Sequence, residues 1–371
     1  SPDEPSTAYG LVAEWVSYPD DFSSATFRLR EGAKFHDGEP VKVEDVIFSM
    51  ELLKKINPLY KYYYKNVLSG EKTGERQVTF KFDMKGNREL PLILGDLPIL
   101  PKHYYEEEGS DGKLRDLSKT TMVPPLGSGP YVIKDFKPGR EVTYERAKDY
   151  WAKGLPVRRG LYNVDSIRYI YFKDRTPAFE AFLSGQIDYW QESSANAWAT
   201  RYNTDSVKSG KIRKEELAHG RVAPMQAFVL NTRREQFKDP RVRRALNLAF
   251  DFEELNKSLF YGMYKRVGSY FDNSELKASG LPQGRELELL EQFKDRLPPE
   301  VFTKEWANPV AKNPGDFRKN LRTAMQLLRE AGWRLDGGRL VNADGKQFSI
   351  EFLIQQDDWK KIVNAYAGAL R

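Results

Sequence analysis

The stretch Pro224-Met-Gln-Ala-Phe-Val-Leu-Asn-Thr-Arg-Arg-Glu-Gln-Phe-Lys-Asp-Pro-Arg-Val-Arg-Arg-Ala-Leu-Asn-Leu-Ala-Phe250 is the part of the sequence around which the chain is organised. It opens with an apolar, β-prone run at residues 227–230, which predicts a strand, and continues through a charged loop. Asp239 and Pro240 then predict the start of a helix, because aspartate is a favoured N-cap residue and proline is favoured at the first helical position. That helix carries apolar residues at helical spacing, namely Val242, Ala245, Leu246 and Ala249.

A second informative unit lies near the start of the chain. Residues 25–30 alternate apolar and polar side chains, which predicts a half-buried strand. A cluster of turn-forming residues follows at 35–40, and residues 43–50 place apolar side chains at positions i, i+3, i+4 and i+7 of a helix that ends before Pro58. Residues 1–21 contain three prolines and are predicted to be irregular.

The middle of the chain predicts an α/β fold class. Residues 166–191 have the pattern strand, helix, strand, and this βαβ unit favours a parallel pair of strands. Ligands of open α/β sheets collect at the carboxyl ends of the strands, so residues 190–198 form a candidate ligand loop. Further strands are predicted at residues 77–83, 131–133, 141–146 and 349–354, and further helices at 251–261, 317–331 and 359–370.

The composition describes a large folded protein with an evenly charged surface. A chain of 371 residues favours two or three domains, because single cores stop growing near about 250–300 residues. With 59 basic and 53 acidic residues interleaved, the net charge of +6 gives no concentrated basic stripe of the kind that nucleic-acid binding requires. The absence of cysteine excludes disulfides and thiolate metal sites. The sequence contains no run of about 18 apolar residues, so no membrane span is predicted. No signal peptide is visible at Ser1, although a mature secreted chain would show none.

No motif predicts catalysis, a metal centre or a cofactor. The three histidines, His36, His103 and His219, lie far apart in the sequence and lack the spacing of metal ligands. Residues 127–130 are Gly-Ser-Gly-Pro, which predicts a tight turn rather than a phosphate-binding loop, because the Lys-Ser/Thr of that loop is missing. Carboxylates are abundant, so a glycosidase-style pair stays open as an alternative.

Two stretches resemble the extracytoplasmic solute-binding proteins of peptide ABC importers, bacterial family 5. The first is the opening stretch, whose Phe228-Val-Leu-Asn-Thr and Asp239-Pro-Arg-Val-Arg-Arg-Ala-Leu are similar to the crossover between the two lobes of that family. The second is Phe27-Arg-Leu-Arg-Glu-Gly-Ala-Lys-Phe-His-Asp-Gly-Glu-Pro-Val-Lys-Val-Glu-Asp-Val-Ile-Phe-Ser. Shorter stretches look like the YejA-type branch, which imports oligopeptides and microcin C: Glu4-Pro-Ser-Thr-Ala-Tyr-Gly-Leu, Tyr18-Pro-Asp-Asp-Phe-Ser-Ser, Gly86-Asn-Arg-Glu-Leu-Pro, Asn196-Ala-Trp-Ala-Thr and Ser269-Tyr-Phe-Asp-Asn-Ser-Glu-Leu.

This resemblance implies a two-lobe periplasmic-binding-protein architecture, also called a Venus flytrap, with an enlarged first lobe. Residues 1–222 would form lobe one without its N-terminal part. Residues 223–371 would form the first part of lobe two, which would lack its C-terminal part and return strand. The resemblance further implies a periplasmic monomer that closes by hinge motion on a peptide or peptide-like ligand and delivers it to an inner-membrane ABC permease. It implies no catalysis, metal, cofactor, nucleic acid or membrane insertion.

Candidate ligand contacts come from both predicted lobes and from the crossover, and for each of them packing or capping is the alternative role. They are Trp190, Gln191, Glu192 and Trp198 in lobe one, Gln226, Phe228 and Asn231 at the crossover, and Arg266, Tyr270 and Phe271 in lobe two. Two other functions stay open. One is a secreted hydrolase that acts on a polymer in an aromatic-lined cleft, and the other is a basic nucleic-acid or lipid-surface binder with steep salt dependence.

Overall fold

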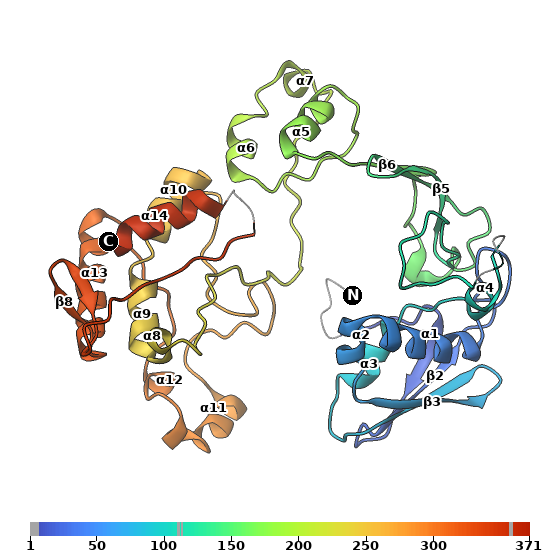
Figure 1. Ribbon diagram of the computed structural model, residues 1–371, viewed down its shortest axis with the longest axis horizontal. Coiled ribbons are helices and arrows are strands. Elements are labelled where there is room, and N and C mark those ends of the chain that lie inside the picture. The colour runs from blue at the N-terminus through green and yellow to red at the C-terminus, as the bar shows by residue number, and fades with distance from the viewer. Residues whose placement is uncertain (1–6, 110–111, 113, 356–358) are drawn as a thin grey trace. The chain divides into compact units, whose positions relative to one another are not determined.

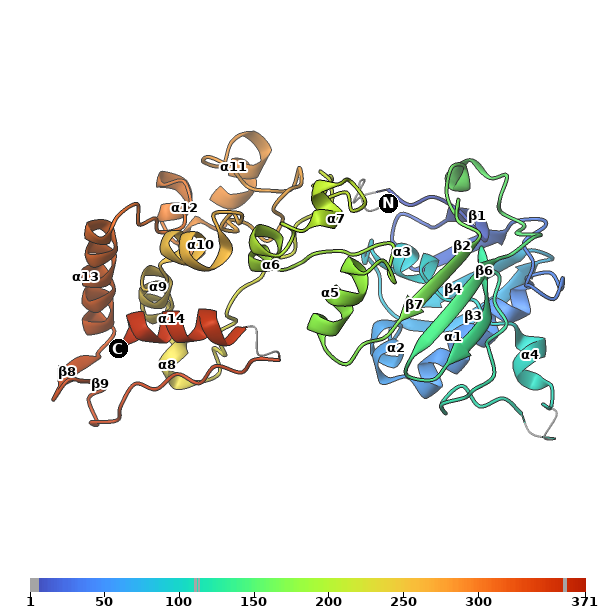
Figure 2. The ribbon, with the colours of Figure 1, turned by 90° about the horizontal axis from the view of Figure 1, so that it is seen from above.

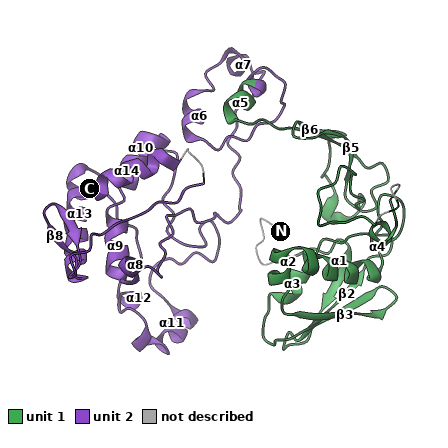
Figure 3. Cartoon of the chain, viewed as in Figure 1, with its two compact units in different colours: residues 1, 6–180 green, residues 2–5, 181–371 purple. Residues whose placement is uncertain are grey.

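The computed structural model describes residues 7–109, 112, 114–355 and 359–371, and the chain divides into two compact units (Figure 3). Unit 1 extends to Glu180 and unit 2 covers Ala181–Arg371, so the boundary falls within helix α5 (Arg175–Leu183). The lobe boundary near residue 222 stays a prediction, because a compact unit is defined by its internal packing and a lobe by the course of the chain. Residues 1–6, at the start of the stretch predicted to be irregular, lie outside the described residues.

Unit 1 begins with an antiparallel sheet in the order β1-β2-β4-β3 (Figure 1 and Figure 2). Every second residue of β2 (Ser24–Leu29) is buried, which confirms the strand predicted at residues 25–30. β1 (Ala13–Ser17) corrects the prediction that residues 1–21 are irregular. Its burial does not alternate, so the local sequence pattern carries no strand signal, and its ladder with β2 decides its conformation. The other strands are β3 (Val67–Gly74) and β4 (Gln77–Phe82).

Helix α1 (Val43–Ile56) has the position that the helical spacing of its apolar residues predicts. Its buried face joins one hydrophobic core with the sheet, in which Val43, Met50, Val78 and Phe80 are at most 4% exposed. Three short helices complete this part of unit 1: α2 (Pro58–Tyr63), α3 (Leu90–Gly95) and α4 (Lys102–Glu106).

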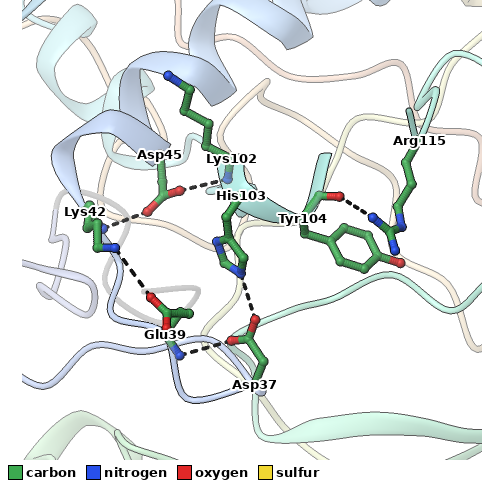
Figure 4. Close-up of polar contacts among 8 residues, drawn as sticks. All are labelled: Asp37, Glu39, Lys42, Asp45, Lys102, His103, Tyr104 and Arg115. Atoms are coloured by element: carbon green, nitrogen blue, oxygen red, sulfur yellow. Dashed lines mark hydrogen bonds and ion pairs between the residues drawn. The ribbon is translucent and has the colours of Figure 1, made fainter. Parts of the chain in front are cut away.

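A polar network ties the start of α1 to the start of α4 (Figure 4). The buried carboxylate of Asp45 accepts hydrogen bonds from the amide of the N-cap residue of α1 at 2.7 Å and from the amide of Lys102 at 2.8 Å. Nearby, Nε2 of His103 lies 2.7 Å from Oδ2 of Asp37. Partial burial raises the pKa of Asp37, but hydrogen bonds from His103 and from a backbone amide outweigh it and hold the pKa below its ordinary value. The network therefore gives His103 a structural role.

The second sheet of unit 1 has the order β5-β6-β7 and is antiparallel (Figure 1 and Figure 2). Its strands, β5 (Tyr131–Lys137), β6 (Glu141–Arg146) and β7 (Ser166–Ile170), were each predicted from the sequence. The predicted βαβ unit is wrong, because β7 pairs with β6 and residues 186–191 form no strand. Gly185 has a φ of +81° and reverses the chain after α5, and the amide of Gln186 donates back to the carbonyl of Ala181 at 2.9 Å. These contacts hold the segment to the end of α5.

Helix α9 (Pro240–Leu248) confirms the start that Asp239 and Pro240 predict. Oδ1 of Asp239 accepts a hydrogen bond from the amide of Arg241 at 2.8 Å. α9 packs against α13 (Pro314–Glu330), and their contact forms the core of unit 2. Its buried residues are Phe237, Val242, Ala245, Leu246, Ala324 and Leu328.

The other elements of unit 2 are short. β8 (Arg334–Asp336) and β9 (Arg339–Val341) form a hairpin whose turn residues Gly337 and Gly338 have φ of +55° and +81°, as a tight hairpin turn requires. The predicted long excursion after residue 281 contains short helices without buried residues. The remaining elements of the chain are η1 (Pro156–Arg158), α6 (Ala195–Thr200), α7 (Asp205–Lys208), α8 (Glu235–Lys238), α10 (Phe252–Phe260), α11 (Gly284–Glu291), η2 (Lys294–Arg296), α12 (Glu300–Thr303) and α14 (Lys360–Leu370).

Two strands predicted in unit 2 are wrong, because residues 227–230 and 349–354 form no ladder. Val229 is 92% exposed and lies between the half-buried Phe228 and Leu230. The burial of the crossover run therefore alternates as in a strand, but no neighbouring strand in the described part of the chain forms hydrogen bonds with its backbone. A strand requires such a partner, and the local sequence does not encode one.

Candidate functional site

All the candidate ligand contacts lie in unit 2, on three segments that the chain brings together. The segments are residues 190–198, 219–231 and 264–273. Local hydrogen bonds shape each of them. The hydroxyl of Tyr264 donates to the carbonyl of Ser193 at 3.5 Å and joins the third segment to the first, and further long-range hydrogen bonds join the third segment to the second.

Glu192 organises the first segment. Its carboxylate accepts hydrogen bonds from the indole N–H of Trp190 at 3.2 Å, from the amide of Ser194 at 2.8 Å and from the hydroxyl of Tyr202 at 3.0 Å. The ring of Trp190 stacks on Phe182, with centroids 6.1 Å apart. Glu192 is thus an anchor for the loop, and its hydrogen bonds support the packing role that was the alternative for Glu192 and Trp190.

The second aromatic residue of this segment, Trp198, has a cation over its ring. Nζ of Lys214 lies 4.2 Å from the centroid of the Trp198 ring and donates to the carbonyl of Trp198 at 2.7 Å. Sequence reasoning missed Lys214, because the contact joins residues far apart in an irregular region. Gln191, in contrast, is exposed.

The end of α10 joins the first segment to the third. Nδ2 of Asn196 donates to the hydroxyl of Tyr261 at 2.9 Å. Tyr261 has a φ of +56°, a left-handed conformation that is uncommon for a residue with a side chain, and Gly262 follows at +73°. A hollow of about 420 Å³ beside this helix end is lined by Glu253, Asn256, Lys257, Tyr261 and Gly262. The predicted helix stop at Gly262 was the available signal for this corner, but it did not identify Tyr261 as a contact.

The third segment is bound to the second by a pair of neighbouring residues. The carboxylate of Asp272 accepts a hydrogen bond from the amide of Gly268 at 2.7 Å, within the third segment. The backbone carbonyl of Asp272 accepts a hydrogen bond from the amide of Ala223, in the second segment, at 2.8 Å. Nδ2 of Asn273 donates to the carbonyl of Arg221 at 2.7 Å. The bonds to Arg221 and Ala223 fix the backbone that leads into the crossover.

This fixed loop exposes two predicted contacts to solvent. Tyr270 is 76% exposed and Phe271 is 49% exposed, and they directly precede the anchoring residue Asp272. The hydrogen bond from Lys277 is the largest cause that holds the pKa of Asp272 below its ordinary value, so the anchor stays charged at neutral pH. Large exposed aromatic side chains on a rigid loop suit ligand contact, because little conformational entropy is lost when they are covered.

Arg266 is held inside unit 2. Its guanidinium donates to Oδ1 of Asn247 at 2.7 Å and to the carbonyl of Pro309 at 2.6 Å, and it lies 5.5 Å from the centroid of the Phe250 ring. Burial lowers the pKa of Arg266. These contacts support its alternative role in packing.

Phe228 is at the centre of an aromatic cluster. Its ring centroid lies 6.2 Å from that of Phe250, 5.3 Å from that of Phe352 and 5.6 Å from that of Tyr366. The hydroxyl of Tyr366 donates to the carbonyl of Leu246 at 2.7 Å, and burial raises the pKa of Tyr366. The cluster therefore holds the crossover onto α14 and α9.

The other crossover candidates, Gln226 and Asn231, are exposed. Oδ1 of Asn231 accepts from the amide of Arg233 at 3.2 Å, which is a local turn contact. In the part of the chain that the structure describes, His, Asp and Glu side chains form no group of three or more that could hold a metal ion. None of the described helices is both long enough and apolar enough to cross a bilayer.

Sequence comparisons identify relatives along the whole chain. The model of bacterial extracellular solute-binding proteins, family 5 middle region, matches residues 7–371. The chain is 51% identical over 372 residues to the probable peptide-binding protein YejA of Agrobacterium fabrum, covering 100% of the chain and 61% of the relative. It is 38% identical over 380 residues to the peptidoglycan-binding protein YepA of the same organism, covering 100% and 61%. The chain thus spans about three fifths of the length of these relatives.

Solved structures share the fold at lower identity. The NikA protein of Brucella suis in complex with Fe(III)-EDTA matches with a TM-score of 0.66 at 23% identity, covering 97% of this chain and 63% of that one. The oligopeptide-binding protein AppA of Bacillus subtilis, in complex with a nonapeptide, matches with a TM-score of 0.60 at 22% identity and the same coverage. The likeness confirms the predicted mixed α/β architecture of a family whose members have two lobes.

The family consists of extracytoplasmic, non-catalytic substrate-binding proteins of peptide and nickel ABC importers. This favours a binding role over the hydrolase that the sequence left open. The resemblance to the YejA-type branch is confirmed by the relative of 51% identity. The chain belongs to the bacterial extracellular solute-binding proteins of family 5.

Proposed function

We propose that the chain binds oligopeptides or peptide-like compounds for an ABC importer, and that unit 2 supplies a wall of the ligand site. The ligand would lie against the surface made by residues 190–198, 219–231 and 264–273. The importer's inner-membrane permease would receive it, in the periplasm, from a monomeric binding protein.

One observation carries this proposal. The segments that were predicted as ligand contacts from three distant parts of the sequence are joined by hydrogen bonds in one unit, through Tyr264 with Ser193 and through Asp272 with Ala223. The joined surface presents Tyr270, Phe271 and Gln191 to solvent. Aromatic rings give a peptide apolar contact, and amide side chains bond its backbone, so the chemistry suits a peptide of varied sequence.

The class of peptide is also part of the proposal. The relatives include a probable peptide-binding protein and a peptidoglycan-binding protein. Short linear peptides, peptide antibiotics of the microcin type and peptide fragments of peptidoglycan share an amide backbone and charged ends. A ligand panel therefore has to contain all three classes.

Isothermal titration calorimetry of the chain against this panel tests the proposal. We expect heat of binding for at least one peptide class, and we expect Tyr270→Ala and Phe271→Ala each to weaken it by about 5- to 30-fold, as for aromatic residues at binding hot spots. Tyr171→Ala is the matched control, because Tyr171 is 58% exposed and lies in unit 1. Its affinity should equal that of the unchanged chain.

Two outcomes would refute the proposal. Heat of binding for no compound in the panel would refute binding by this chain. Equal loss of affinity in the Tyr171→Ala control would refute the assignment of the site to unit 2. Circular dichroism of each variant separates lost affinity from lost folding, and unchanged thermal midpoints are expected because all three side chains are exposed.

A further inference from the structure

Helix α2 of unit 1 has two apolar faces, and only one of them is buried. Tyr60 and Tyr64 stack with centroids 5.7 Å apart and face the core. Leu59, Tyr62 and Tyr63 lie at positions i, i+3 and i+4, and at about 100° per residue they share a different face. Leu59 is 70% exposed and Tyr62 is 69% exposed. A short helix with a second, uncovered apolar stripe marks an interaction surface.

A groove of about 480 Å³ lies between α1 and β3, which contact each other, and Lys61 is the α2 residue that lines it. Its apolar lining includes Ile47, Met50 and Phe80, and at its edge Leu68 is 65% exposed. Gly70 keeps the groove open, because a Cβ atom at this position would lie 2.7 Å from the Phe80 ring. A partly apolar recess therefore lies beside α2, on the side of Lys61.

Lysines surround this apolar surface. Lys54, Lys55 and Lys61 line the groove, and Nζ of Lys65 lies 4.4 Å from the centroid of the Tyr62 ring. Within the described residues, none of these four side chains has a carboxylate at ion-pair distance, and Glu51 is the one acidic side chain that lines the groove.

The lysines of the neighbouring sheet are different. Nζ of Lys72 lies 2.7 Å from the carboxylate of Glu44, and Nζ of Lys81 lies 2.8 Å from that of Glu71. Carboxylates therefore neutralise these lysines of the sheet, whereas Nζ of Lys54 donates to the carbonyl of Val67 at 2.7 Å and the charges of the four lysines around α2 stay unpaired by carboxylates within the described residues. The free charge and the uncovered apolar residues coincide, which points to a partner that is both anionic and apolar.

We propose that this surface docks on an anionic phospholipid bilayer. The α2 surface is defined by its exposed lysines and its exposed apolar residues: Lys55, Leu59, Lys61, Tyr62, Tyr63, Lys65 and Leu68. The lysine ammonium groups meet lipid phosphates, while their methylene stems and the tyrosine rings lie at the level of the headgroups. Leu59 and Leu68 reach the acyl boundary, and the groove accommodates acyl segments beside them.

An acidic protein partner fits this surface less well. Charge pairing with such a partner needs the lysines alone, whereas here an aliphatic residue and two tyrosines stand between them. A mixture of lysine, tyrosine and leucine in one short stretch of chain is typical of segments that lie in a membrane interface.

Sedimentation of the chain with phospholipid vesicles tests the proposal. We expect binding to vesicles of equimolar phosphatidylglycerol and phosphatidylcholine and none to pure phosphatidylcholine. Each lysine near an anionic surface contributes about fivefold to partitioning, so Lys55→Gln with Lys61→Gln should weaken binding about 25-fold. At about 1 M salt the Debye length is near 3 Å, so the attraction between charges is screened and the binding that remains comes from apolar contacts. The double variant Leu59→Ser with Tyr62→Ser should remove this remaining binding.

The matched control removes the same charge elsewhere in unit 1. Lys85→Gln with Lys119→Gln alters two lysines that are 75% and 78% exposed and that pair with Asp21 and Asp116. We expect its vesicle binding to change less than about threefold. All the altered side chains are exposed, and circular dichroism confirms that each variant folds.

Several results would overturn the proposal. The first is that the chain does not sediment with the anionic vesicles, and the second is that it sediments equally with neutral vesicles. The third is that the control pair of substitutions weakens binding as much as Lys55→Gln with Lys61→Gln, which would indicate an effect of net charge alone. Binding to polyglutamate as tight as to the vesicles, and unchanged by the Leu59 and Tyr62 substitutions, would assign the surface to an acidic protein and would also overturn it.

Discussion

Replacing Phe228 with alanine tests whether packing in unit 2 holds the crossover segment in place. The ring of Phe228 contacts Phe250, Phe352 and Tyr366, with centroids 5.3–6.2 Å apart. Loss of a fully buried phenylalanine costs about 3–5 kcal/mol, and each aromatic pair adds about 0.5–1.5 kcal/mol beyond the area that it buries. Because Phe228 is half-buried, we expect a loss of about 2–3 kcal/mol in the free energy of unfolding of unit 2.

Thermal unfolding followed by near-ultraviolet circular dichroism measures this loss. For a unit of this size, about 2–4 °C of midpoint is lost per kcal/mol, so the transition of unit 2 should fall by about 5–10 °C. Val229→Ala is the matched control, because Val229 is 92% exposed and is the next residue. Its midpoint should stay within about 1–2 °C of the unchanged chain. Equal midpoints for the two variants would refute the packing role of Phe228 and would restore it as a candidate ligand contact.

Three further predictions concern anchoring groups. Glu192→Ala removes the acceptor of three hydrogen-bond donors and should cost about 2–3 kcal/mol in denaturant unfolding, whereas the exposed Gln191→Ala should change stability by less than about 0.5 kcal/mol; similar losses would contradict the anchor. Asp239→Ala removes the N-cap of α9 and should cost about 1 kcal/mol in the same assay, so an unchanged midpoint would contradict the cap. Burial raises the pKa of Tyr64 from 10.0 to about 12, so its contribution to stability is complete below pH 10 and is lost as the pH rises through about 12. Tyr64→Phe should flatten the fall in stability over this range, and a fall as steep as in the unchanged chain would show that other groups cause it.

Helix positions could be predicted because their signals are local. Asp239 caps α9 with its own carboxylate, and Gly332, with a φ of +87°, follows the end of α13 as the sequence predicted. The start of α13 was placed at residue 317 rather than at Pro314. Asn313 accepts from the amides of residues 315 and 316, so Asn followed by Pro was an N-cap signal that the apolar spacing alone did not reveal.

Strand pairing could not be predicted because its causes are not local. β7 was located correctly, yet its neighbour is β6, and the antiparallel ladder joins Tyr144 to Ile167. The helix that follows β7 suggested a parallel return, but Gly185 and the bond from Gln186 to Ala181 hold the next segment to the end of α5. A pattern of strand, helix and apolar run specifies the elements, whereas ladder contacts specify which of them pair.

In the candidate site, too, local features could be predicted from the sequence and long-range contacts could not. Sequence patterns selected three segments, and hydrogen bonds between them gather these segments in unit 2. The sequence patterns did not distinguish side chains that anchor the site from side chains that are exposed for a ligand. The reason is that the anchoring partners lie far away in the sequence: Phe228 contacts Tyr366, near the end of the sequence, and Arg266 donates to Pro309. A side chain already enclosed by such partners gains little when a ligand arrives, since its surface is already removed from water. The exposed residues Tyr270, Phe271 and Gln191 still have surface to bury, so ligand affinity should depend on them, while Phe228, Arg266 and Glu192 should determine the stability of the wall that carries them.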